Sequence, residues 1–546
     1  MRIALPLPLL CAALAATPAL AAPSAADCDV ADFQTVLVPA RTTTGPAGTD
    51  TPAVAIHEAR AHWLDRRRVQ WPGVEPAAGD AFRLHFAAQG GMDVRADERV
   101  AGADRTFELS HAREDVPPAL AAKFRHVAAG VVLNVAAEDA ALRELHRGQL
   151  VMTHEREGRV VRATAVQPAG ALDDLYAAAA EPLALGATIR RARAGTVDAG
   201  AVAPAADGGA TRFTLWAPTA RSVGLCLYAA DEGRATGFAP LRLDPRTGAW
   251  SAELRGELSR TYYRYVVDVH VRGTGFVRNR VTDPWSLGLG ADSRRSVVVD
   301  LDAPDLKPPG WDAAKRPDRV AAPTDLVIYE LHVRDFSRDD ATVPPALRGK
   351  YLAFTRPDTV GSRSLRELSA AGVTDVHLLP AFDLATVPER GCVEPDVAGR
   401  GGPADEVRQA LVAAVAARDC FNWGYDPFHY TVPEGSYATD ASDGVTRIRE
   451  FRAMVQALHR TGLRVGLDVV YNHTMAAGQD PQSVLDRVVP DYYHRLDALG
   501  RVERSTCCAN TATENALMAK LMIDSAVVWA RDYRIDSFRF DLMGHQ

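Results

Sequence analysis

The sequence predicts a multidomain α/β protein with all-β accessory modules: an N-terminal accessory domain, a β-sandwich, and an incomplete TIM barrel, the first half of a (β/α)8 fold. Three observations predict this class. The chain has 546 residues, too many for one hydrophobic core. Short β-type runs separated by turns fill its middle part, as in an all-β sandwich. After residue 325, apolar strands alternate with helical stretches, which indicates parallel βα units.

We divide the chain into four predicted segments: 1–21 signal peptide, 22–176 accessory domain, 177–310 sandwich, and 311–546 incomplete barrel with strands one to four. Residues 1–21 combine Arg2, an apolar run and an end of the small-x-small form. Signal peptidase cleaves after an end of this form. We therefore expect a secreted or periplasmic protein. No later stretch is apolar enough to cross a membrane. Cys11 and Cys28 lack the small residue that precedes a lipidated cysteine, so a lipid anchor is less expected.

The formal net charge of −7 is small for this length and gives no sign of nucleic-acid binding, and we expect a monomer. Seven cysteines are present, and export would allow them to pair. Cys392 and Cys420 flank one long insertion and either staple it or stay free. Adjacent Cys507 and Cys508 can pair only through a strained ring, so we expect two separate thiols. No cysteine or histidine spacing indicates zinc.

The first half of the chain supplies the β-rich modules. Residues 82–86 alternate as a strand does, and 139–147 read as a short helix that Gly148 ends. A Gly/Ala/Pro-rich stretch at 195–209 marks a boundary. Beyond it we predict sandwich strands at 211–216, 222–228, 250–254 and 262–269. Trp216 and Trp250 are expected in the core rather than as faces that bind sugar.

The second half supplies the βα units. Predicted strands one to four are 326–333, 374–379, 464–470 and 535–540, with helices at 362–371, 445–459 and 514–533. The strands are apolar because helices cover both faces of a parallel sheet. Half a barrel leaves two unpaired edges. We therefore interpret the chain as a fragment of a longer enzyme that carries strands five to eight and a C-terminal β domain.

Two of these strands run directly into polar residues. Strand three is followed by Asn472 and His473, and strand four carries Arg539 and is followed by Asp541. Barrel enzymes build active sites at the carboxyl ends of their strands. Arg539 and Asp541, two residues apart, point to the same side, so the guanidinium can keep the carboxylate ionised. A structural ion pair at the rim of the barrel is the alternative.

Five motifs, in this order, resemble the α-amylase superfamily of glycoside hydrolases and, within it, the type I pullulanases and limit dextrinases. They are residues 329–337 (Tyr-Glu-Leu-His-Val-Arg-Asp-Phe-Ser), 421–427 (Phe-Asn-Trp-Gly-Tyr-Asp-Pro), 464–474 (Arg-Val-Gly-Leu-Asp-Val-Val-Tyr-Asn-His-Thr), 505–512 (Ser-Thr-Cys-Cys-Ala-Asn-Thr-Ala) and 535–546. Two residues depart from the family pattern. Phe421 replaces a tyrosine, and Ser537 replaces a glycine and could crowd the barrel core.

The resemblance implies a debranching enzyme that hydrolyses α-1,6-glucosidic bonds in pullulan, amylopectin and limit dextrins by a retaining two-carboxylate mechanism. It implies that Asp541 is the nucleophile and Arg539 its partner, and that His473, Tyr425 and Asp426 bind the substrate. Trp423 and Phe428 could equally be packing residues that hold their loop. An isoamylase-like debranching amylase is the close alternative. A non-catalytic α-glucan-binding protein is the alternative of another class.

In this family the general acid lies on strand five and a stabilising aspartate lies beyond strand seven, so neither is present in these 546 residues. Asp536 precedes the active rim and Glu514 begins an outer helix, so neither can substitute. We therefore expect this chain alone to be inactive. No metal ligand is assigned and no cofactor is required. Calcium is left open because Asn472 matches a calcium ligand of many α-amylases, although a structural hydrogen bond is the preferred role.

Overall fold

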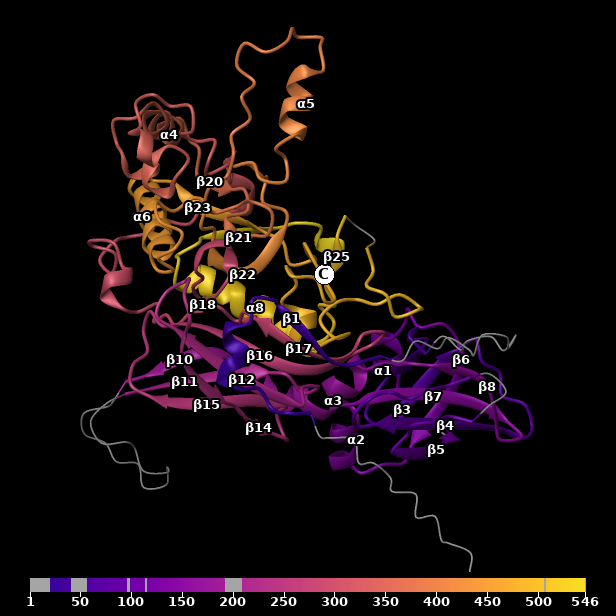
Figure 1. Ribbon diagram of the computed structural model, residues 1–546. Coiled ribbons are helices and arrows are strands. Elements are labelled where there is room, and N and C mark those ends of the chain that lie inside the picture. The colour runs from indigo at the N-terminus through magenta and orange to yellow at the C-terminus, as the bar shows by residue number, and fades with distance from the viewer. Residues whose placement is uncertain are drawn as a thin grey trace, which may run out of the picture.

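The computed structural model describes residues 20–40, 56–95, 99–112, 115–191, 209–504 and 507–545. Figure 1 shows the N-terminal β-rich part and the sandwich side by side, with the α/β part lying across them. The predicted signal peptide, residues 1–21, falls almost entirely outside the described residues. No helix in the described ranges has the length and apolar character needed to cross a bilayer.

The accessory domain is built on one eight-stranded sheet with the strand order β8-β7-β4-β5-β6-β3-β2-β9. The predicted strand at 82–86 and the predicted helix at 139–147 are confirmed as β4 and α2. Phe82, Leu84 and Phe86 alternate along β4 and are buried, which fixes the face that packs on the core. The elements are β2 (Ala61–Trp63), β3 (Arg68–Pro72), β4 (Asp80–Ala87), β5 (Arg105–His111), β6 (Gly130–Val135), β7 (Gln149–Arg156), β8 (Arg159–Thr164), β9 (Val166–Gln167), α1 (Pro118–Lys123), α2 (Asp139–Leu145) and α3 (Ala169–Ala180).

The predicted sandwich is confirmed as two antiparallel sheets, β1-β17-β16-β12-β13 with β18 beside β16, and β10-β11-β15-β14. Trp216 and Trp250 are buried in it, and each indole N–H donates to a backbone carbonyl, at 3.0 Å in both cases. Both tryptophans are therefore core residues, as expected. The strands are β1 (Gln34–Pro39), β10 (Gly186–Arg190), β11 (Ala210–Trp216), β12 (Ser222–Tyr228), β13 (Ala235–Pro240), β14 (Arg242–Asp244), β15 (Ala249–Arg255), β16 (Tyr262–Val271), β17 (Gly275–Val281) and β18 (Ser296–Val297).

The first described segment belongs to the sandwich, although the predicted accessory domain of 22–176 includes it. β1 pairs antiparallel with β17, and Cys28 forms a disulfide with Cys226 on β12. The disulfide joins residues about two hundred positions apart, and no local pattern in the sequence predicts it. The disulfide also occupies the sulfur of Cys28 that had been considered for a lipid anchor. The predicted boundary at residue 176 falls inside α3.

The four predicted strands of the α/β part are confirmed as one parallel sheet, in the order β19-β20-β23-β26. They are shorter than predicted: β19 (Ile328–Leu331), β20 (Asp375–Leu378), β23 (Arg464–Val469) and β26 (Ser537–Phe540). The three predicted helices are confirmed as α4 (Val360–Ala370), α6 (Thr446–Arg460) and α8 (Ala516–Arg531). Within the described residues β19 and β26 each have one neighbour, so both edges of the sheet are unpaired.

A long insertion separates β20 from α6, and Figure 1 shows its tip, with α5, projecting from the body of the molecule. Cys392 and Cys420 form a disulfide at its base, with Cα atoms 5.0 Å apart, so the predicted staple is confirmed. The remaining elements of this part are β21 (Phe382–Leu384), α5 (Val407–Ala413), β22 (Pro427–Pro433), β24 (His473–Thr474), α7 (Leu485–Val488) and β25 (Ala509–Asn510). Short 3-10 turns lie at Ala25–Asp29, Ala291–Ser293, Pro304–Leu306, Pro323–Asp325, Pro345–Leu347, Tyr351–Thr355 and Met543–His545.

Candidate active site

The carboxyl end of β26, beside that of β23, carries the two residues predicted to carry the catalysis. Arg539 Nη1 donates to Asp541 Oδ1 at 3.0 Å, so the predicted contact between them is confirmed. The same nitrogen donates to Asp468 Oδ2 at 2.6 Å. The backbone N–H of Asp541 donates to the carbonyl of Val469 at 2.9 Å, which continues the ladder past the strand and fixes the carboxylate at the rim.

Asp468 is a member of this network to which the sequence reasoning gave no role. It lies opposite Arg539 in the parallel register, is 3 % exposed, and also accepts a hydrogen bond from the Tyr425 hydroxyl at 2.7 Å. Burial raises the pKa of Asp468 to about 6, against the opposing effect of Tyr425 and Arg539. A carboxylate inside an apolar strand needs a buried partner, and that signal could have found the pair.

His473 lies beside the network with both ring nitrogens engaged. Its Nε2 is 2.8 Å from the carbonyl oxygen of Tyr425, and its Nδ1 is 2.6 Å from Asn472 Oδ1. The ring is 1 % exposed, and burial lowers the pKa of His473. In this arrangement the imidazole fixes the loop that carries Tyr425. Its contact with a sugar hydroxyl stays a prediction.

Asn472 has the structural role that was expected for it. Its Nδ2 donates to the backbone carbonyl of Asp541 at 2.9 Å, which ties the end of β23 to the end of β26. Its side-chain oxygen faces the ring of His473, so the atom that calcium would take is already in contact. Calcium binding at Asn472 stays a prediction.

The two other predicted substrate contacts, Tyr425 and Asp426, point in different directions. Tyr425 is half-buried, and its hydroxyl reaches the Asp468–Arg539 pair. Asp426 is 6 % exposed and accepts hydrogen bonds from the backbone N–H of Thr386, at 3.0 Å, and from its hydroxyl. Burial raises the pKa of Asp426 to about 6. Its carboxylate therefore holds the loop, and its predicted sugar contact stays a prediction.

Trp423 is 65 % exposed, so of the two roles left open for it the packing role is not the one observed. One expectation around the site is wrong. Cys507 and Cys508 are not separate thiols but form a disulfide with each other. The two side chains lie on the same side of the loop, with their Cα atoms 3.8 Å apart. Cys507 Sγ lies 3.9 Å from His473 Nε2, so this disulfide borders the site.

The remaining carboxylates considered from the sequence are engaged elsewhere. Asp536 pairs with His459 Nε2 at 2.8 Å and accepts from the backbone N–H of Val465, at the start of the strands. Glu514 pairs with Arg495 at 2.7 Å. Neither carboxylate is available at the rim, as predicted.

The serine that replaces the family's glycine is accommodated. Ser537 Oγ lies 3.1 Å from His377 Nε2 on β20, which is separated from β26 by β23. Gly466 pairs with Ser537 across the sheet, and a Cβ at Gly466 would lie 2.2 Å from the His377 ring. The missing side chain at Gly466 therefore makes the room that His377 and Ser537 share.

A second cluster of buried carboxylates consists of Asp383, Glu389 and Glu434. One carboxylate oxygen of each residue lies within 4.8 Å of one oxygen of each of the other two. Arg447 supplies the positive charge there, with Nη2 2.7 Å from Glu389 Oε2. Asp383 is paired with His429 at 2.7 Å. Burial and the neighbouring carboxylates raise the pKa of Glu434 well above its usual range. The pair between Arg447 and Glu389 ties this segment to α6.

Comparison with known proteins agrees with this arrangement. The family model "Pullulanase N2 domain" matches residues 58–174, and "Carbohydrate-binding module 48 (Isoamylase N-terminal domain)" matches 199–286. A pullulanase of Klebsiella pneumoniae is 41 % identical over 90 % of this chain and 47 % of its own length. A chloroplastic pullulanase of Arabidopsis thaliana is 36 % identical over 89 % of this chain and 49 % of its own length.

A crystal structure of a maltotriose complex of the Klebsiella pneumoniae enzyme matches with a TM-score of 0.79 at 38 % identity, over 90 % of this chain and 55 % of that one. The pullulanase of Klebsiella oxytoca matches with a TM-score of 0.78 at 39 % identity, over 90 % and 48 %. This chain is a relative of the pullulanases. It spans about half the length of the curated pullulanases it matches. The two matched family models fall on the accessory sheet and on the sandwich.

Proposed function

We propose that this chain is part of a debranching enzyme of the pullulanase type, which hydrolyses α-1,6-glucosidic bonds in pullulan, amylopectin and limit dextrins. One observation carries the proposal: the carboxylate of Asp541 stands at the carboxyl end of a parallel strand, held by Arg539 at 3.0 Å. The relationship to pullulanases over 90 % of the chain supports the choice of bond.

We further propose that the four-stranded parallel sheet supplies strands one to four of a (β/α)8 barrel. Its two unpaired edges support this, since a barrel closes only when every strand has two neighbours. The greater length of the related pullulanases supports it too. Closure would place the site at the face where the strands end, as in other barrels.

In this proposal Asp541 attacks the anomeric carbon and forms a glycosyl ester, while a second carboxylic acid about 5 Å away protonates the leaving oxygen. Arg539 positions the Asp541 carboxylate for the attack through its hydrogen bond. Asp468 orients Arg539 from below and cannot act as the acid, because it is 3 % exposed and bound to Arg539 and Tyr425.

The test compares two polypeptides. Residues 1–546 alone are expected to release no reducing ends from pullulan. A longer polypeptide from the same reading frame, if it supplies the acid, is expected to cleave pullulan, and Asp541→Asn should lower its kcat by a factor on the order of 10^4 or more. An Asp541→Asn enzyme with normal kcat would remove Asp541 from the mechanism. Sequencing beyond codon 546 shows whether the frame continues.

We also propose export to an oxidising compartment, and an α-glucan-binding role for the sandwich. The disulfides Cys28–Cys226 and Cys392–Cys420 support export, because such bonds persist outside the reducing cytosol. The match to a carbohydrate-binding module supports the second point, and it is the observation that favours a non-catalytic glucan-binding protein if the frame stops. Retardation of the purified chain in starch-containing native gels tests glucan binding in either case.

A further inference from the structure

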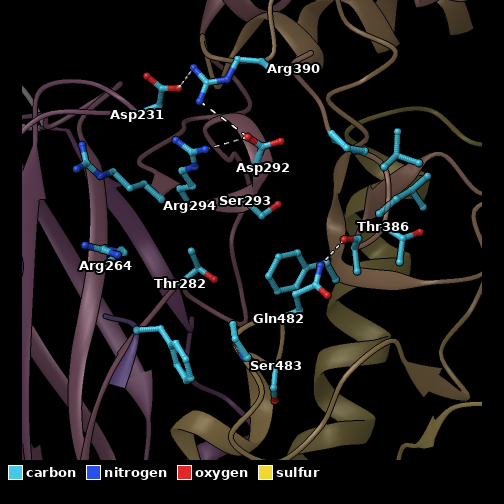
Figure 2. A pocket seen from close by; sticks show the side chains of 18 of the residues that line it. Asp231, Arg264, Thr282, Asp292, Ser293, Arg294, Thr386, Arg390, Gln482 and Ser483 are labelled. Carbon is cyan, nitrogen blue, oxygen red and sulfur yellow. Dashed lines mark hydrogen bonds and ion pairs between the residues drawn. The ribbon is translucent and has the colours of Figure 1, made fainter. Parts of the chain in front are cut away.

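A cavity lies between the sandwich and the α/β part, and its lining includes Thr386, the partner of Asp426. Its volume is about 980 Å³. The sandwich side supplies residues 231–233 and 292–295, and the α/β side supplies 384–388 and 481–483. Figure 2 shows Thr282, Ser293 and Gln482 between these two walls. None of the residues of the Arg539 network lines it.

The lining of this cavity is positively charged, although the protein carries a net charge of −7. Six arginines face three carboxylates. A concave site of one sign raises the local concentration of ligands of the opposite sign. The charged lining residues are Arg264, Arg280, Arg294, Arg295, Arg390 and Arg487, with Asp231, Glu232 and Asp292.

The three carboxylates neutralise only the rim. Glu232 Oε1 lies 2.9 Å from both Arg294 Nη1 and Arg390 Nη2. Arg390 also lies 3.4 Å from Asp231, and Arg294 lies 3.4 Å from Asp292, as the dashed lines in Figure 2 show. These side chains are largely exposed, so the pairs contribute little to stability.

The other four arginines form a group that is satisfied mainly by carbonyl oxygens, and we call it the carbonyl-bound group: Arg264, Arg280, Arg295 and Arg487. Arg487 donates to the carbonyls of Pro481 and Phe33, both at 3.0 Å. Arg295 donates to the carbonyls of Ala230 and Gly233, at 2.6 and 2.5 Å. Among the described residues only Arg280 has a carboxylate within 4 Å, that of Asp27 at 3.7 Å.

This group still has unused hydrogen-bonding capacity. The Nε atoms of Arg264 and Arg487 are buried and have no hydrogen-bond partner among the described residues. Arg487 is 4 % exposed, and burial together with the neighbouring Arg264 lowers the pKa of Arg487 to about 10. A buried cation without a carboxylate is costly, because a carbonyl dipole replaces only part of its hydration. An anion in the cavity would supply the missing counter-charge.

We propose that this cavity binds a phosphorylated sugar, with the phosphoryl group on the carbonyl-bound arginines. Guanidinium groups bind phosphoryl oxygens through paired charge-assisted hydrogen bonds, and three such oxygens can serve arginines from several elements. The volume far exceeds that of a phosphate ion and leaves room for a sugar ring. The hydroxyl oxygens of Thr282 and Ser293, which already contact His429 and Asp383, can still accept hydrogen bonds from sugar hydroxyls. Neutral glucans supply no counter-charge. Binding in this cavity does not depend on bond hydrolysis and is measured without it.

Titration calorimetry on the purified 546-residue chain, at one fixed ionic strength, tests the proposal with glucose 6-phosphate, inorganic phosphate and maltotriose. We expect glucose 6-phosphate to bind, inorganic phosphate to bind more weakly at the same site, and added salt to weaken both. Absence of phosphate-dependent binding would overturn the proposal. Equal affinity for inorganic phosphate would overturn the sugar part, and maltotriose competing with glucose 6-phosphate would point instead to a neutral glucan.

Variants locate the binding. Arg264→Gln should weaken glucose 6-phosphate by about tenfold or more, since it removes a charged donor. Glu232→Gln, an exposed rim position, should strengthen it about threefold by removing a repelling charge. Arg319→Gln, an exposed arginine outside the cavity, is the matched control and should change nothing. Unaltered affinity in both Arg264→Gln and Glu232→Gln would overturn the assignment. If Arg264→Gln does not fold, the affinity of Glu232→Gln alone decides.

Discussion

Arg539 is the residue through which the candidate active site is held together. One of its nitrogens contacts Asp541 at the rim and Asp468 within the sheet, so the outer carboxylate is positioned by the inner one. The Tyr425 hydroxyl completes the contact from the neighbouring loop. The Asp541 carboxylate is thus held by a cation that Asp468 and Tyr425 hold in place.

At the scale of residues, the clearest pH dependence belongs to Asp283 of the sandwich, which is fully buried and accepts from Tyr263 and Tyr265 at 2.9 and 3.3 Å. Burial raises the pKa of Asp283 to about 6. Since the folded state then holds the proton more tightly than the unfolded chain, the stability present below pH 4 is lost as the pH rises to 6. The loss amounts to about 3 kcal/mol.

Urea denaturation of wild type and Asp283→Asn between pH 3.5 and 7 measures this loss. The wild-type free energy of unfolding should fall relative to that of the variant across pH 4–6, and the difference should be constant above and below this window. Parallel curves throughout the range would show that Asp283 does not change its charge state on unfolding.

Residue positions were predictable from the sequence where a local rule applies. The period of two along a strand places Arg539 and Asp541 on one side, and the structure agrees. The orientation of Asp426 was not predictable, because Thr386, its partner, lies 40 residues away on the other side of the insertion. The same holds for Asp468, whose partner is on another strand.

At the scale of elements, the strands and helices of the α/β part were predicted to within a few residues, because apolar strands and amphipathic helices alternate on both sides of the long insertion. The pairing of β1 with β17 and the Cys28–Cys226 disulfide were missed, since both join segments far apart in the chain. Local periodicity reports which face of an element is buried and carries no information about its partner.

The disulfide at the base of the insertion gives a prediction at this scale. Closing a loop of 28 residues lowers the entropy of the unfolded segment, which stabilises the folded segment by about 3–4 kcal/mol in the chain-entropy description. The Cys392→Ser/Cys420→Ser double variant should therefore open the insertion locally, because few contacts other than this bond hold its exposed tip. Limited proteolysis should cut the variant within residues 393–419 well before wild type.

The matched control is Cys28→Ser/Cys226→Ser, which removes the disulfide of the sandwich instead. This variant should leave cleavage of the insertion unchanged and should lower the melting temperature of the sandwich. Equal cleavage rates in the insertion for all three proteins would mean that the segment is held by its other contacts.

At the scale of the whole molecule, one continuous hydrophobic core runs through the accessory sheet, the sandwich and the α/β part. Polar contacts add to it: Arg272, which follows β16, binds Asp491 with two hydrogen bonds, at 2.8 and 3.1 Å, and donates to the carbonyl of His57. The order of the modules was predictable from composition, whereas this shared core was not, because it arises only when distant faces meet. We therefore expect the parts to unfold together.

Arg452 of α6 tests that expectation. It is 1 % exposed and donates to the carbonyls of Leu301 and Leu306 in the connector, at 2.9 and 3.1 Å, and to that of Asp532 after α8, at 3.1 Å. Arg452→Ala leaves these carbonyls without their donor, which should cost about 3 kcal/mol or more and loosen the contact between sandwich and α/β part. Calorimetry should show one transition for wild type and an earlier, separate transition of the α/β part for the variant. Arg449→Ala, on the exposed face of the same helix, should melt as wild type does. A single unshifted transition in Arg452→Ala would show that the apolar core alone couples the two parts.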